Sequence, residues 1–166
     1  EVFRLEIVYP FGLMQAPNLE TGLFLPRLMH LGTHRSSALE IAERLEELGG
    51  FLDISLGNKR TTFTLHGMSK YFSNYLDTLF EIIYESSFPE EEIEIQKKNA
   101  IQGYLVNITT TSVIASKNFK EIMFGEASFM GQSLDETRIA LIERESLVDF
   151  HEQNIIGSKC DVFLCG

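Results

Sequence analysis

The side chains best suited to metal chemistry lie in the first quarter of the chain. His30 and His34 are four residues apart and Glu40 follows them, so two imidazoles and a carboxylate could meet at a metal ion if the segment were helical. Gly32 and Thr33 separate the two histidines, however, and the residues after them are typical of a helix exit. We therefore expect one histidine to pack against the fold and the other to lie in a loop, with no metal bound.

The remaining acidic and imidazole groups have simpler structural interpretations. His66 lies beside threonines on the polar face of a strand pattern, so we expect a solvated or hydrogen-bonded ring. His151 lies between Asp149 and Glu152 in a helical pattern, where a surface ion pair would explain it. The run Glu90–Glu94 could bind Ca²⁺ or a basic substrate, but the helix macrodipole favours acids in a first turn, and we interpret the run as a helix start.

One segment has the spacing of a metalloenzyme helix without its residues. Residues 22–33 read Gly-Leu-Phe-Leu-Pro-Arg-Leu-Met-His-Leu-Gly-Thr. This segment resembles the active-site helix of the insulinase/pitrilysin family of zinc peptidases, where the pattern runs Gly-Leu-Ala-His-x-x-Glu-His-x-x-x-x-Gly-Thr. With the closing Gly-Thr aligned, Leu23 and Arg27 stand at the two zinc-binding histidines. Pro26 stands at the glutamate that acts as general base.

The residues at these positions cannot perform the chemistry that the resemblance implies. Leu23 has no lone pair to donate, and Arg27 is always cationic and would repel Zn²⁺. Pro26 has no acid–base group and lacks an N–H, so it kinks or confines the helix. The family's third ligand, a glutamate farther along the chain, falls at Gly103 or Tyr104, and neither residue replaces a carboxylate. We predict that this chain binds no zinc and has no catalytic residue, and the pattern assigns no substrate-binding residue.

Hydrophobic periodicity predicts the elements around this segment. We expect strands at 2–11 and 161–164, a hairpin whose strands 52–56 and 63–65 turn at 57–60, and helices at 38–48, 71–84, 90–105 and 113–124. Two capping boxes mark helix starts, at Ser37–Glu40 and Ser133–Glu136. Helical crossovers combined with a direct hairpin predict an α+β fold, a mostly antiparallel sheet with helices packed on one face.

The order of these elements also resembles the family's metallopeptidase-like α/β sandwich over nearly its whole length. The matching landmarks are Gly32-Thr33, Ala38–Ala42, Leu48–Gly50, Phe88–Glu92, Phe124-Gly125 and Val162–Gly166. Each landmark is short, and the resemblance therefore rests on their order and spacing.

Composition restricts the classes of protein. The chain has 166 residues, 44% of them hydrophobic, and a net charge of −10. This indicates one domain with a sizeable core, and the acidic balance argues against a nucleic-acid surface. No apolar run approaches the roughly 18 residues that span a bilayer, so we expect no membrane partner. Cys160 and Cys165 fall on opposite faces of a strand pattern, which argues against a disulfide between them.

The two ends of the sequence suggest a piece of a longer protein. The chain opens in a strand pattern without an initiator Met and stops after an apolar run. We therefore expect residues 1–166 to be a single inactive peptidase-like domain from a longer polypeptide. No targeting segment is visible, so a cytoplasmic location is the expectation, and a periplasmic or organellar one stays open.

Three functions are compatible with these observations. In the family that the chain resembles, an active domain often pairs with a degenerate copy, as in mitochondrial processing peptidase. The resemblance implies that this chain helps a homologous active subunit or domain to enclose an unfolded peptide, with zinc held only by the active partner. The second function is a scaffold or binding module with no role in proteolysis. The third is a hydrolase with a site of another kind, for which we recognise no motif.

Overall fold

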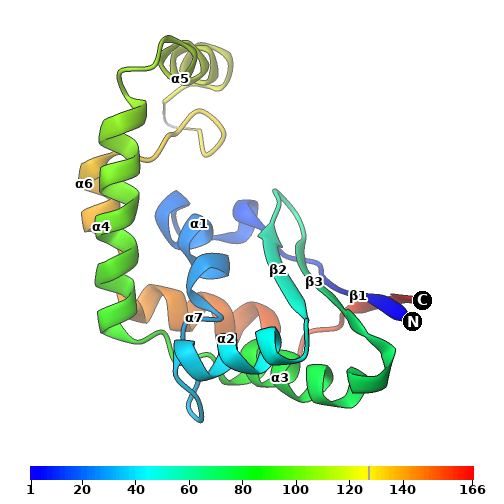
Figure 1. Cartoon of the computed structure of the whole chain (residues 1–166). Helices are drawn as coiled ribbons and strands as arrows, with labels where there is room; N and C mark the ends of the chain where they lie inside the picture. The colour runs from blue at the N-terminus through cyan, green and yellow to red at the C-terminus, as the bar shows by residue number, and fades with distance from the viewer. Residues whose placement is uncertain (127) are drawn as a thin grey trace.

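The computed structural model describes residues 1–126 and 128–166. These residues form an antiparallel sheet with helices on one side of it (Figure 1), so the predicted α+β fold is confirmed. The strands are β1 (Val2–Tyr9), β2 (Phe51–Leu56), β3 (Thr61–Met68) and β4 (Asp161–Cys165). The helices are α1 (Leu19–Leu28), α2 (Ala38–Glu47), α3 (Phe72–Glu85), α4 (Glu90–Asn107), α5 (Thr111–Phe124), α6 (Glu136–Ala140) and α7 (Arg144–Ile155).

The sheet has the strand order β2-β3-β1-β4, and every neighbouring pair is antiparallel. On β1, Phe3, Leu5, Ile7 and Tyr9 are buried while the residues between them are more exposed, as the alternation of a strand requires. The predicted hairpin is confirmed. Strand β2 pairs with β3 along its length, and a hydrogen bond from the Gly57 amide closes the turn.

The core lies between this face of the sheet and helices that include α1, α3 and α7. Phe24, Leu25 and Leu28 of α1 have no exposed surface. The ring of Tyr75 on α3 packs so closely on β3 that any side chain at Gly67 would overlap it. Gly67 therefore sets the distance between α3 and the sheet.

The predicted N-cap of helix α6 is wrong by two residues. The capping box was expected to begin at Ser133, but the cap is Asp135, whose carboxylate accepts the Arg138 amide at 2.8 Å. Asparagine, aspartate and serine are similarly good caps, so the pattern contained two candidates within one turn. The other capping box, at Ser37, is confirmed at the start of α2.

The surface ion pair expected for His151 is also wrong. Its side chain is 3% exposed, and Nε2 lies 2.7 Å from the Ile83 carbonyl oxygen of α3. Leu147 and Phe150 share this side of α7, at the spacing of a buried helix face. The ring also meets the edge of Phe88, and burial lowers the pKa of His151.

Helix α4 extends away from the sheet, and α5 lies at its far end (Figure 1). Within the described part of the chain, α5 contains no buried residue. Phe119, Ile122 and Met123 lie on one side of α5 and are 61%, 83% and 58% exposed. A helix of this length is marginal in water without packing, so we regard this side as an unpartnered apolar surface.

Candidate functional site

Helix α1 contains the positions that the resemblance assigned to zinc chemistry. The Asn18 side chain caps it by accepting the Thr21 amide at 2.7 Å. Leu23 and Arg27 lie one turn apart, on a different side from the buried face of the helix. Leu23 is half-buried, whereas Arg27 is exposed and its guanidinium lies 5.6 Å from the Phe24 ring centroid.

Pro26 lies in the last turn of α1. It cannot donate a hydrogen bond to the Gly22 carbonyl, and the helix ends two residues later, at Leu28. The Met29 amide closes this turn by donating to the Leu25 carbonyl at 3.1 Å. Pro26 therefore lies within the helix and leaves the Gly22 carbonyl without its usual amide donor from residue 26.

Because α1 ends at Leu28, His30 and His34 lie outside it and are not a helical pair. Both have exposed surface, but burial of the His30 ring lowers its pKa, so His30 is partly packed while His34 lies in the loop. Glu40 is engaged elsewhere, since one carboxylate oxygen accepts both the amide and the hydroxyl of Ser37 at 2.8 Å. In residues 1–126 and 128–166, no group of three or more His, Cys, Asp or Glu side chains could hold a metal ion.

The distal position lies on α4, which packs against α1 (Figure 1). Gly103 is exposed with open space around it, and Tyr104 is half-buried. Zinc sites are built from thiolate, imidazole and carboxylate ligands. The alkyl, guanidinium and phenol groups at these positions therefore do not fit Zn²⁺, and no step of a mechanism can be derived through a metal here.

Two hollows accompany these positions, one of about 330 Å³ beside α1 and one of about 440 Å³ between α4 and α5. The first contains Leu23 and the second contains Tyr104 in its wall. Both are lined by Lys120, Ser133 and Leu134, so the hollows adjoin. We call the two together the α1–α5 trough. The sequence did not indicate it, because its walls come from segments far apart in the chain.

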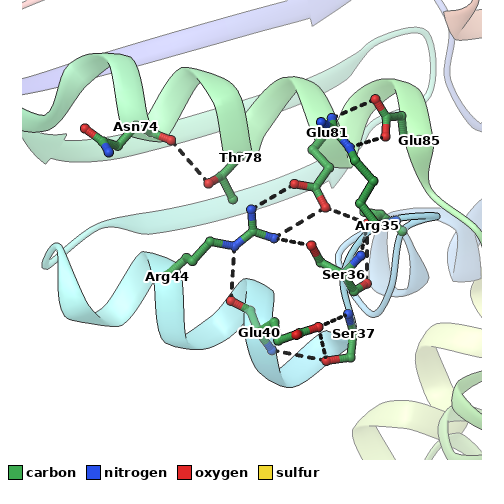
Figure 2. A network of polar contacts seen from close by, with 10 residues as sticks. Arg35, Ser36, Ser37, Glu40, Arg44, Asn74, Thr78, Glu81 and Glu85 are labelled. Atoms are coloured by element: carbon green, nitrogen blue, oxygen red, sulfur yellow. Dashed lines mark hydrogen bonds and ion pairs between the residues drawn. The ribbon is translucent and has the colours of Figure 1, made fainter.

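A polar network fixes the loop that follows α1 (Figure 2). Arg44 of α2 donates to the Glu81 carboxylate of α3 at 2.9 Å and to the Ser36 hydroxyl at 2.6 Å. The Thr33 hydroxyl donates to the same carboxylate at 2.6 Å. Burial alone would raise the pKa of Glu81, but these hydrogen bonds and the nearby guanidinium together lower it to about 2. The network links α2, α3 and the loop, and its role is structural.

His66 and the acidic run at the start of α4 behave as surface residues. His66 is exposed, in agreement with a solvated ring, and its neighbour is the Phe51 ring at 6.4 Å between centroids. The acidic run begins α4, as predicted, and Glu94 pairs with Lys97 at 2.8 Å. Cys160 and Cys165 are free thiols.

Strand β2 forms one edge of the sheet and packs beside α1 (Figure 1). Within the described residues it pairs with β3 alone. The outward backbone groups of such an edge can accept another extended chain.

No helix among the described residues is both long and apolar enough to cross a membrane.

Comparison with known proteins gives consistent results. Residues 7–134 match the model of the insulinase family, peptidase family M16. Over 70 residues the chain is 34% identical to an uncharacterized zinc protease of Rickettsia felis, a match that covers 42% of this chain and 17% of the relative. Over 77 residues it is 27% identical to a probable mitochondrial-processing peptidase subunit beta of Arabidopsis thaliana, covering 46% of this chain and 14% of that protein.

The fold is similar to a solved structure described as the peptidase M16 inactive domain of Pseudomonas fluorescens. The TM-score is 0.88 at 17% identity, over 98% of this chain and 40% of that one. At this identity the likeness concerns the fold. The chain spans less than half the length of each of these relatives.

Proposed function

This chain belongs to the insulinase family of peptidases, family M16, and we propose that within the family it is a non-catalytic domain that pairs with an active domain or subunit to enclose a peptide substrate. The observation that carries the proposal is the structure of α1. Its buried side packs into the core of the family's fold, while Leu23, Pro26 and Arg27 provide neither a zinc ligand nor a general base. On this proposal, zinc is held only by the active partner.

The exposed side of α5 supports a partner. Phe119, Ile122 and Met123 form an apolar surface at the end of the molecule away from the sheet, and such surfaces mark interaction sites. The lengths of the relatives support the further proposal that residues 1–166 are one domain of a longer polypeptide. The Arabidopsis relative is itself described as a subunit.

The edge of β2 supports a peptide substrate. An extended peptide can add to an exposed sheet edge through main-chain hydrogen bonds, which require no particular side chains. This edge lies beside α1 and therefore near the position where an active relative would cleave. An unfolded peptide thus has a place to bind even though this chain supplies no chemistry.

The experiment combines the full-length protein with a homologous M16 subunit that contains an intact H-x-x-E-H motif. We expect the two to bind in a pull-down, and the peptidase activity of the partner on extended peptides to rise. The Ile122→Lys variant should weaken binding at least tenfold, a change of about 1.4 kcal/mol. Leu141→Lys, at an exposed apolar residue outside α5, is the matched control and should bind normally.

Two results would reject the proposed function. A partner that neither binds nor gains activity would reject the proposal and favour a scaffold module with no role in proteolysis. If this chain alone had peptidase activity and a point mutation in it abolished that activity, both the non-catalytic partner domain and the scaffold module would be rejected.

A further inference from the structure

We propose that the α1–α5 trough binds extended peptide segments that combine apolar side chains with carboxylates. The inference rests on the proposed function, because it names the class of peptide that the domain would accept. It concerns the residues of α5 that line the trough, which do not include Phe119, Ile122 and Met123.

The walls of the trough are largely apolar. The hollow beside α1 is lined by Leu13, Leu19, Leu23, Phe129, Met130 and Leu134 together with a few polar residues. The hollow between α4 and α5 continues this surface with Ile108, Val113 and Ile114. Adjoining hollows of about 330 and 440 Å³ can together take several side chains of an extended peptide, and apolar walls favour apolar ones.

The charge of the walls selects among such peptides. Lys117 and Lys120 line the trough, and neither hollow has an aspartate or glutamate among the described residues that line it. This is notable in a chain with a net charge of −10. Lys117 also pairs with Glu121 at 3.8 Å, outside the lining. Lys120 lines both hollows and is therefore the cation best placed to meet a carboxylate.

The polar residues of the walls suit the same ligand. Asn58, Ser112, Ser116 and Ser133 provide side chains that can donate hydrogen bonds to carboxylate or carbonyl oxygens. Where an active relative would hold a metal ion over the peptide, this chain presents Leu23 to an apolar side chain and Lys120 to an acid.

The test measures binding of two fluorescently labelled peptides to the purified protein at low and high salt. One peptide alternates leucine or phenylalanine with glutamate, and the other replaces each glutamate with lysine. We expect the acidic peptide to bind at least tenfold more tightly, and the difference to shrink as salt screens the charges. Lys120→Gln should remove most of the difference. Lys98→Gln, which changes the net charge equally at an exposed position on α4, should preserve it.

Several results would overturn the inference. Equal binding of the two peptides would do so, as would tighter binding of the lysine peptide or equal effects of the two lysine variants. If unlabelled acidic peptide displaced neither labelled peptide, whereas palmitate occupied the trough, the trough would be assigned to a lipid instead. Association with an active M16 subunit is measured separately, so a protein that binds this partner without preferring acidic peptides would refute the inference and leave the proposed function standing.

Discussion

The carboxylate of Glu81 should make the stability of this protein depend strongly on acid pH. Its side chain is 5% exposed and accepts hydrogen bonds from Arg44 and Thr33. The pKa of Glu81 falls from an ordinary value of 4.5 to about 2 in the folded protein. Because one pKa unit corresponds to 1.36 kcal/mol, the folded state gains about 3 kcal/mol from this ionised group.

The sign of the pH dependence follows from the lowered pKa. The stabilisation is fully present above pH 4.5, where the unfolded chain is also ionised, and it is lost as the pH falls toward 2. Glu81→Gln should therefore lower the free energy of unfolding by about 3 kcal/mol at pH 7. At pH 3 the difference between the two proteins should be less than half of that value.

Urea unfolding of both proteins at several pH values between 3 and 7 measures this difference. Glu85→Gln is the matched control, since Glu85 also pairs with an arginine and lies one turn farther along α3. Its pair with Arg35 is exposed, and such pairs contribute about 0–1 kcal/mol. If Glu81→Gln destabilised the protein equally at pH 3 and pH 7, or no more than the control, the assigned role of the network would be wrong.

Two further predictions concern the zinc positions and the buried imidazole. Purified protein should contain far less than one zinc per chain by metal analysis. The variant that restores all four positions should remain a poor peptidase, because metal ligands require accurate geometry and supporting hydrogen bonds. Efficient, zinc-dependent cleavage by that variant would contradict the second expectation. The restored positions are Leu23→His, Pro26→Glu, Arg27→His and Gly103→Glu. The pKa of His151 is lowered in the folded protein, so this residue should reduce the free energy of unfolding as the pH falls below the ordinary histidine pKa near 6.5. Unfolding curves of the wild type and of His151→Gln at several pH values should reveal this loss in the wild type alone.

Local patterns predicted most of the secondary structure because the relevant forces act over a few residues. The alternation in β1 follows from one buried face, and the acids after Pro89 follow from the macrodipole at the start of α4. The same local reasoning failed for His151, since its acidic neighbours indicated a surface. Only the packing of α7 against α3 shows that this ring faces inward.

The parts of the site that involve distant residues could not be predicted from the sequence. Arg44 and Glu81 are 37 positions apart and lie on different helices, so no spacing rule connects them. The α1–α5 trough likewise requires α1, α4, α5 and the loop at 129–134 to be placed in space. By contrast, the assignment of Leu23 and Arg27 to zinc-ligand positions could be proposed from the sequence, because the family motif fits within two turns of one helix.

The structure is compatible with the proposal that this helix keeps the fold of the family without its chemistry. In α1, Phe24, Leu25 and Leu28 are buried, whereas the side that carries Leu23 and Arg27 is half-buried at Leu23 and exposed at Arg27. Substitutions on that side leave no cavity in the core and no buried charge, so they escape the large costs of core mutations. Selection for a binding surface can then act on these positions independently of folding. A lysine-bearing apolar trough beside α1 is the kind of surface that such selection could retain once cleavage is performed by a partner.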